Sequence, residues 1–187
     1  KSQFKIIENE YANPQVVVHI SGNSVQELLD TIQANDSIII QKIKKSEIRI
    51  LQNQIKEDSL ANTEKISQKF NVKINIPTKY KMVMHGKRFI WFKKEITSGN
   101  QSLVFYQIPL GSIKDNEKAI NRITKIRDSI GRIYIHGAVP RTRMVTETAY
   151  SPYLSKTTIF GRDAFETKGN WELERDFMSG PFVNYAI

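Results

Sequence analysis

The sequence predicts an α+β protein with a largely antiparallel sheet, and with one long and one shorter helix packed on one face of that sheet. Two observations lead to this prediction. Pairs of short apolar runs joined by turns rich in Gly, Asn or Pro recur along the chain, and two stretches carry an apolar stripe with the period of a helix. The chain has 187 residues, 40% of them hydrophobic, which is enough for one ordinary core. We therefore expect a single domain over residues 1–187.

The N-terminal stretch predicts two strands joined by a turn. Residues 4–10 form the first apolar run, and the β-branched run VVVHI at residues 16–20 forms the second. The intervening YANPQ is typical of a turn, because Pro14 cannot donate a hydrogen bond within a sheet.

A long helix is predicted over residues 25–56. Ser24, with Glu27 three residues later, has the pattern of a capping box, which marks a helix start. The apolar residues that follow stay within about 60° of one helical face, with Ile43 at the centre of the stripe. The stripe keeps its phase through residues 35–37, which favours one continuous helix. The alternative is a break in that stretch and a newly capped second helix.

The rest of the chain predicts further hairpins and one more amphipathic helix. Gly86 lies in the turn of one hairpin, whose second strand is apolar on both faces and is therefore expected at the centre of a sheet. Asp115 is expected to cap a helix that ends at Gly131. The predicted elements are, in order, a helix over 63–70, strands over 72–76, 80–84, 88–94 and 102–108, a helix over 115–130, and strands over 132–135, 157–160 and 164–167.

Three stretches of the chain resemble one another. Residues 4–57 and 89–131 each have the order strand, turn, strand, helix, and so predict two β-β-α-like units. The final FVNYAI resembles the opening of both units. We therefore expect a further unit to start at residue 182 and to be truncated by the end of the chain.

The positive charge of the chain is concentrated in one segment. The net charge is +9, and residues 81–140 hold 11 basic and 4 acidic residues, a net +7. A local basic surface attracts polyanions such as nucleic acid or acidic glycan, although it is also what an ordinary solvated face looks like. The candidate anion-binding residues in this segment are Lys87, Arg88, Lys118, Arg122 and Lys125. The last three share one face of the predicted helix, away from its apolar side.

A second candidate site lies in the stretch PRTRMVTETAYSPYL. Arginines and aromatic residues clustered on a loop are enriched in binding sites. The candidates there are Arg141, Arg143, Tyr150 and Tyr153. The alternative interpretation is that these residues only fix the position of a strand crossing.

The sequence shows no catalytic or metal-binding constellation, and no cofactor is expected. The chain has no cysteine, which excludes a cysteine nucleophile and thiolate metal ligands. Its three histidines lie in separate segments without the spacing of metal ligands. Glu172, Glu174 and Asp176 alternate, so that two of these carboxylates on one strand face could do acid–base work, but the polar face of a half-exposed strand has the same pattern.

Several motifs together resemble an uncharacterised family of bacteroidete lipoproteins that carries a domain of unknown function. They are RDSIG at residues 127–131, VTETAYSPY at 145–153 and FETKGNWELERDFMSGPFVNYAI at 165–187. The earlier stretches YANPQ, PTKY, FIWFKKEI and FYQIPL fit the same pattern, so that the resemblance covers nearly the whole chain.

The resemblance implies a place in the cell envelope, with a lipid anchor upstream of Lys1. The anchored domain would face the periplasm or the cell surface. The resemblance also implies a further strand and helix after Ile187, and it implies no activity, cofactor or catalytic residue. We therefore expect a non-enzymatic domain that binds or scaffolds a partner in the periplasm or at the cell surface. The sequence does not identify the partner, and an envelope protein is one candidate. Contact with the membrane is expected only through the lipid anchor, which this chain lacks. The alternative is a binder of an anionic polymer through the basic 81–140 surface.

Overall fold

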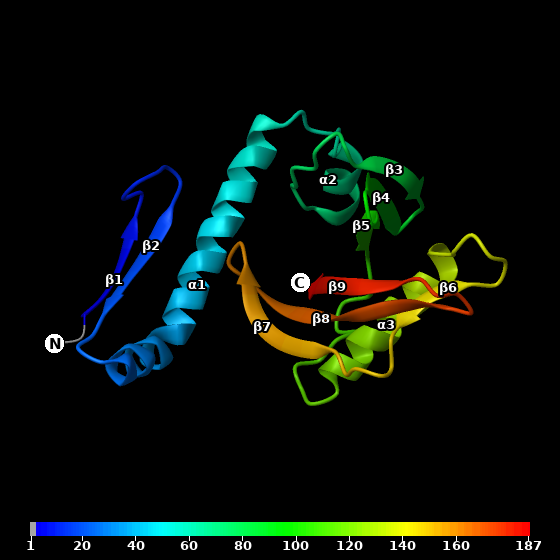
Figure 1. Cartoon of the computed structure of the whole chain (residues 1–187). Helices are drawn as coiled ribbons and strands as arrows, with labels where there is room; N and C mark the ends of the chain where they lie inside the picture. Colours follow the sequence, from blue (N-terminus) through cyan, green and yellow to red (C-terminus); the bar gives the residue numbers. More distant parts are fainter. Residues whose placement is uncertain (1–2) are drawn as a thin grey trace. The chain divides into compact units, whose positions relative to one another are not determined.

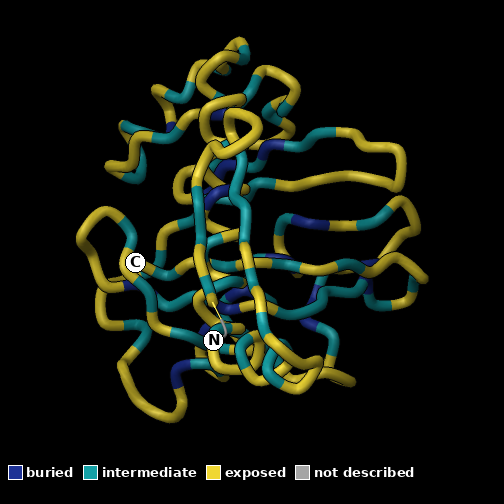
Figure 2. The backbone as a smooth tube through the Cα atoms, turned by 60° about the vertical axis from the view of Figure 1, so that its left-hand side comes forward, coloured by how far each residue is buried: buried dark blue, intermediate teal, exposed yellow. Residues whose placement is uncertain are grey.

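The computed structural model describes residues 3–187 and confirms the α+β class (Figure 1). The described strands pair antiparallel throughout and form three separate sheets. The chain divides into two compact units, Lys1–Gln107 and Ile108–Ile187. Fully buried positions are few and occur in short stretches of the backbone (Figure 2). The elements are β1 (Gln3–Glu8), β2 (Val16–Ser21), α1 (Val25–Glu57), α2 (Glu64–Phe70), β3 (Lys81–His85), β4 (Phe89–Ile96), β5 (Gly99–Tyr106), α3 (Ala119–Tyr134), β6 (Arg143–Thr146), β7 (Tyr153–Ile159), β8 (Arg162–Glu174) and β9 (Ser179–Ala186).

The first unit begins with the β1–β2 hairpin and α1. The helix starts at the predicted cap, where Ser24 Oγ accepts a hydrogen bond from the Glu27 backbone N–H (3.2 Å). The Glu27 carboxylate accepts one from the backbone N–H of Asn23 (2.7 Å), the residue before the N-cap, and so differs from a standard capping box by one position. α1 then runs for 33 residues without interruption, which confirms the continuous helix. Asn35, inside the stretch where a break was the alternative, donates its side-chain amide to the carbonyl of Thr31 (2.8 Å) and stays within the helix.

The face of α1 that packs on the hairpin differs from the predicted face by about 60°. Ser46 is the buried residue of the helix, and the half-buried Leu28 and Asn35 lie on the same line along it. Ile43, predicted at the centre of the buried stripe, is 40% exposed. The prediction is wrong because a two-stranded hairpin is narrower than the apolar stripe and covers only one flank of it.

The rest of the first unit is the β3-β4-β5 sheet with α2. β4 is the central strand, as its apolar residues on both faces predict, and Phe92 is only 2% exposed. Ile66 of α2 and Ile90 of β4 are fully buried in the same cluster. The predicted strand over 72–76 does not form. Its end residue Ile76 belongs to this core, so the apolar alternation there reflects packing rather than sheet pairing.

The second unit is a sheet in which β8 is the central strand. Phe165 to Lys168 pair with both β7 and β9, so those two strands lie on opposite edges of β8. Trp171 and Glu172 pair with both β6 and β9, which places β6 beyond β7 on the same edge. The turn between β7 and β8 lies at Phe160 and Gly161, both with positive φ, which is the geometry that a two-residue hairpin needs. The C-terminal FVNYAI is therefore an edge strand whose partner is β8.

The ends of α3 differ from the prediction. The helix begins at Ala119, and Asp115 pairs with Lys156 instead (2.6 Å). It also continues past Gly131 to Tyr134, so the short strand over 132–135 does not form. Gly131 is buried in the last turn of the helix, where an added Cβ would lie 2.3 Å from the carbonyl oxygen of Met144. This glycine allows the backbones of α3 and β6 to touch and does not end the helix.

A buried arginine joins α3 to the C-terminal strand. The Arg127 guanidinium lies 3.7 Å from the centre of the Phe182 ring, and its Nη1 donates a hydrogen bond to Thr146 Oγ1 (2.9 Å). Asp128 Oδ1 accepts hydrogen bonds from both the backbone N–H and the hydroxyl of Thr146 (2.7 Å each). The RDSIG and GPFVNYAI motifs therefore meet in one packing centre, which gives them a structural role.

The strand-strand-helix order of the two predicted repeats is present, but the repeats are not equivalent. In the first, α1 packs on its own hairpin. In the second, β4 and β5 belong to the first compact unit and α3 to the second.

Candidate anion-binding site

The basic residues predicted on α3 do share an exposed face. Lys118, Arg122 and Lys125 are exposed, and all lie within about 60° of one another around the helix. Arg132, which the sequence analysis did not select, extends the same line by two further turns. Arg122 also donates its Nε–H to the carbonyl of Ser112 (3.1 Å), which fixes part of its side chain. The second unit therefore carries a line of four cations.

This line of cations ends near an open depression of about 600 Å³ that is lined by arginines. Arg143 and Glu174 are cross-strand partners at the end of β6 and β8. Arg132 of α3 forms an ion pair with Glu174, the acidic residue in the lining of the depression (Nη2 to Oε1, 2.9 Å). The lining residues are Arg141, Arg143, Glu174 and Arg175. Three guanidinium groups thus border a space in which only one carboxylate offsets them.

A pinned loop positions the first of these arginines. Thr142 is 1% exposed, accepts a hydrogen bond from the Gly137 backbone N–H (2.9 Å) and donates one to the carbonyl of Val139 (2.6 Å). An added Cβ at Gly137 would lie 2.6 Å from Leu173 Cδ1, so the loop lies directly against β8. Because Arg141 directly precedes the buried Thr142, the hydrogen bonds of Thr142 also fix the position of the Arg141 backbone.

Two of the lining arginines have left-handed backbone geometry. Arg141 has a φ of 68° and Arg175 a φ of 67°. This region is sparsely populated by residues with a Cβ and costs on the order of 1 kcal/mol or more per residue. Glycine would adopt both conformations without this cost. The chain therefore keeps two arginines at positions where its own stability would favour another residue.

The predicted loop tyrosines lie elsewhere in the second unit. Tyr150 is an exposed residue of the β6–β7 connection, and Tyr153 begins β7. Neither lines the arginine depression. The structure thus brings Arg141 and Arg143 together and leaves the two tyrosines out. As a binding site the four-residue group stays a prediction.

Lys87 and Arg88 are exposed in the β3–β4 turn, within the first compact unit. The positive segment 81–140 is consequently divided between two units. We therefore restrict the candidate site to the second unit, where the geometry is defined by paired strands and by α3.

The face of the sheet that carries Tyr153 also holds a carboxylate–phenol pair. The Tyr185 hydroxyl donates a hydrogen bond to Glu166 Oε2 (2.6 Å), and Lys168 Nζ lies 2.5 Å from the other carboxylate oxygen. The hydrogen bond from Lys168, followed by that from Tyr185, lowers the pKa of Glu166. The hydrogen bond to Glu166 raises the pKa of Tyr185 to about 12.

This pair predicts a stability change at high pH. The pKa of Tyr185 is higher in the folded chain than its ordinary value of 10.0, so its contribution is present below pH 10 and is lost as pH rises towards 12. We expect the difference in unfolding free energy between the wild type and Tyr185→Phe to shrink over that range, measured by urea unfolding. Tyr153→Phe, at a tyrosine 66% exposed, is the control for removing a tyrosine hydroxyl and should change the unfolding free energy at neutral pH by no more than about 0.5 kcal/mol. A constant difference for Tyr185→Phe would contradict the prediction.

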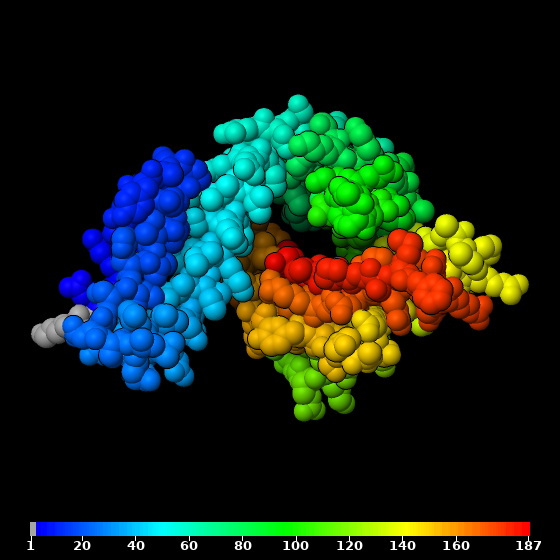
Figure 3. Space-filling view, viewed as in Figure 1, coloured from blue at the N-terminus to red at the C-terminus, as the bar shows by residue number. Residues whose placement is uncertain are grey.

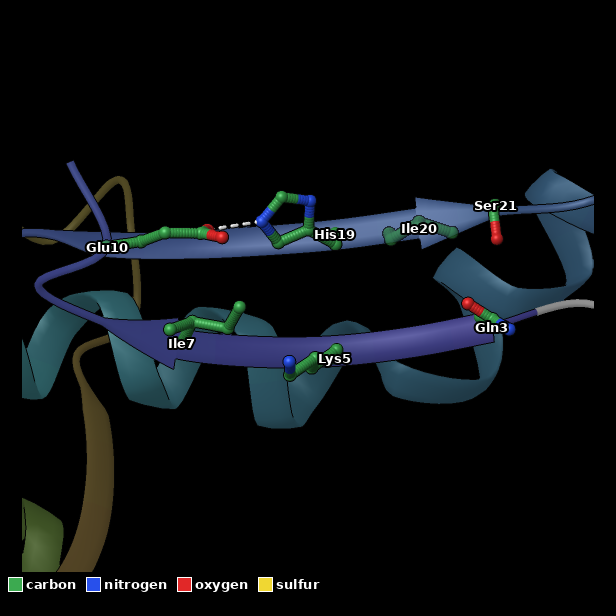
Figure 4. Close-up of a pocket in the computed structure, with 7 residues that line it drawn as sticks. All are labelled: Gln3, Lys5, Ile7, Glu10, His19, Ile20 and Ser21. Carbon is green, nitrogen blue, oxygen red and sulfur yellow. Dashed lines mark hydrogen bonds and ion pairs between the residues drawn. The ribbon is translucent and has the colours of Figure 1, made fainter.

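A smaller depression of about 350 Å³ lies on the outer face of the N-terminal hairpin (Figure 4). Its one ion pair joins His19 Nε2 and Glu10 Oε2, which are 2.5 Å apart. Among the described residues no three potential metal ligands lie together. This face therefore presents a single ion pair on a strand surface.

Sequence reasoning missed Arg175, Arg132 and Thr142. Arg175 joins Arg143 only because the β6–β8 register places Glu174 opposite Arg143. Because Gly131 has the pattern of a helix end, the sequence predicts a strand at Arg132, whereas α3 continues to Tyr134. A longer helix with the same basic phase would have indicated Arg132.

Two family models match the chain. One of them, described as a domain of unknown function (DUF4837), matches residues 59–187, which is more than half of the sequence. The chain belongs to the DUF4837 family. A second model, also a domain of unknown function (DUF8532), matches residues 1–56. No curated protein and no solved structure matches the chain.

The boundary between the two matches falls at the end of α1. The DUF4837 part holds α2 and all later elements, and thus the whole of the arginine depression. The DUF8532 part holds the β1–β2 hairpin and nearly all of α1. Both matches agree with an uncharacterised family. None of the described helices is long and apolar enough to span a membrane.

Proposed function

We propose that the chain is a non-enzymatic binding domain of a cell-envelope lipoprotein, and that its DUF4837 part binds an anionic glycan. The observation that carries this proposal is the convergence of Arg141, Arg143 and Arg175 on one open depression. Arginine presents a planar fork of donors that suits carboxylate and sulfate groups. The line of cations on α3 provides a track for the neighbouring charges of a polymer.

Backbone strain supports this interpretation. Left-handed geometry at non-glycine residues concentrates at functional sites, and two of the three lining arginines have it. The absence of aromatic side chains from the lining favours a glycan over single-stranded nucleic acid, which is bound largely by stacking of bases on aromatic rings. The placement in the envelope rests on the sequence motifs that resemble a lipoprotein family.

The test is heparin binding by the arginine variants. We expect Arg141→Gly and Arg175→Gly each to lower the affinity for a heparin oligosaccharide, measured by calorimetry at low salt, by about tenfold or more. The same changes should raise the free energy of unfolding by about 1 kcal/mol, because glycine relieves the left-handed strain. Opposite signs for binding and stability are the signature of a functional site.

Two further variants define the outcome. Lys118→Glu with Arg122→Glu and Lys125→Glu should weaken binding in a way that diminishes as salt is raised. The charge-matched control replaces three exposed lysines of the first unit, Lys65, Lys73 and Lys81, by glutamate, and should leave the affinity nearly unchanged. If the control lost as much affinity for heparin, the effect would come from the net charge of the chain and not from a site on α3. Tighter binding to a single-stranded oligonucleotide than to heparin would replace the glycan by nucleic acid.

A further inference from the structure

One side of α1 is an exposed apolar line. The hairpin covers only one flank of the helix (Figure 3), and on the other flank Leu29 is 53%, Ile40 50% and Leu51 57% exposed. These three residues are spaced by eleven positions, which is three helical turns, so they lie within about 40° of one another. An exposed apolar line of about 33 Å on a helix is unusual for a surface that meets only water.

The line is symmetric about its middle residue. Leu29 precedes Ile40 by eleven positions, and Leu51 follows it by eleven. Asp36 and Lys44 lie four positions before and after Ile40, both exposed and both within about 40° of it around the helix. Asp36 otherwise accepts hydrogen bonds only from its neighbour Ser37 among the described contacts. Reversing the helix about Ile40 therefore exchanges leucine for leucine and aspartate for lysine.

Along the whole of α1, acidic residues are concentrated in the first half and basic residues in the second half. Residues 25–41 hold three acidic residues and no basic one, a net −3, and residues 42–57 hold five basic and two acidic residues, a net +3. Two of the basic residues, Lys42 and Arg49, bind Glu8 of β1 and lower its pKa. The remaining lysines of the second half are exposed. Two such helices attract each other when antiparallel and repel each other when parallel.

We infer that α1 pairs antiparallel with α1 of a second copy of this chain, around a two-fold axis at Ile40. In this arrangement Ile40 meets Ile40 of the second copy, Leu29 lies at the level of its Leu51, and Asp36 at the level of its Lys44. The same patch serves both copies, as a two-fold interface requires. Buried leucine and isoleucine provide the attraction, and the charges select the direction and the register.

The first experiment measures the mass of the 187-residue chain by sedimentation from low to high micromolar concentration. We expect a monomer–dimer equilibrium. Ile40→Asp should raise the dissociation constant by about 30-fold or more, because it puts charges of like sign at the centre of the interface. The control is Ile38→Asp, which is 55% exposed, chemically identical and about 160° away around the helix, and it should leave the equilibrium unchanged. Thermal unfolding of both variants checks that the fold is intact.

The second experiment exchanges the charges. Asp36→Lys alone and Lys44→Asp alone should each weaken the dimer, whereas the double variant should restore it, because antiparallel helices then pair the exchanged charges again. A single-copy mass at every concentration would overturn the inference. So would a dimer that Ile40→Asp leaves intact, or a double variant no tighter than the single ones. A monomeric chain that Ile40→Asp destabilises would show that the chain itself covers this line.

Discussion

Replacing Gly131 by alanine is expected to lower the free energy of unfolding by about 3 kcal/mol, near the upper end of the cost of overpacking. The added Cβ would lie 2.3 Å from the carbonyl oxygen of Met144, and that atom is backbone. A side chain could rotate away, but here α3 and β6 must move apart. This movement would also disturb the hydrogen bonds of Thr146 with Arg127 and Asp128. Urea unfolding measures the loss, and hydrogen exchange should locate it in α3 and β6.

The matched control is the same substitution at Gly86, in the turn between β3 and β4. A Cβ there would have Phe89 Cβ as its nearest neighbour, at 4.0 Å. Since the site has room, Gly86→Ala should change stability by no more than about 0.5 kcal/mol. If both variants lost the same stability, the effect would come from the glycine-to-alanine change in general and the close contact of α3 with β6 would be disproved.

Replacing Phe92 by alanine is expected to cost about 3–5 kcal/mol of unfolding free energy. The ring is 2% exposed and packs in the cluster formed by α2 and β4. Its removal leaves a cavity, and the fully buried Ile66 and Ile90 beside it lose contact surface. The measurement is chemical unfolding, with hydrogen exchange of β3, β4 and β5 as the local readout.

The control for Phe92→Ala is the same substitution at an exposed phenylalanine. Phe177 is 104% exposed in the β8–β9 turn, so Phe177→Ala should leave stability within about 0.5 kcal/mol of the wild type. A comparable loss from the two variants would mean that the cluster around Phe92 is not a packed core.

The sequence predicted what depends on neighbours along the chain. The unbroken phase of apolar residues through 35–37 was sufficient to predict one continuous α1, and the turn at Gly86 was sufficient for the β3–β4 hairpin. The buried face of α1 could not be predicted in this way, since it depends on how wide the hairpin beneath it is. The helix has more apolar surface than two strands can cover, and periodicity alone does not say which part remains exposed.

The predicted start and end of α3 were wrong because of one aspartate, Asp115, and one glycine, Gly131. A glycine after an apolar helical run has the pattern of a helix end, and the same residue is also used where two backbones touch. Gly131 has the second role, which only the position of Met144 reveals. Asp115 has the pattern of an N-cap but pairs with Lys156, forty-one residues later in the chain.

The candidate site was predictable only in part, because sequence patterns indicate residues that are close to one another along the chain. Arg141 and Arg143 were selected because they are close in sequence, and the structure places both at the depression. Arg175 comes from the turn after β8 and reaches the same place through the pairing of Arg143 with Glu174. Single-sequence patterns contain no register between strands that are some thirty residues apart, so this third arginine required the fold.

The order of strand pairing has a consequence for how fast the chain reaches its structure. Every described strand pair except β6–β8 joins strands that are consecutive in the chain, so most pairings close short loops at small entropic cost. Each such hairpin can form as soon as its second strand leaves the ribosome. The pairing of β6 with β8 must wait until β7 and the first half of β8 have been made. The arginine depression, which spans this one non-consecutive pair, is therefore among the last features of the molecule to be assembled.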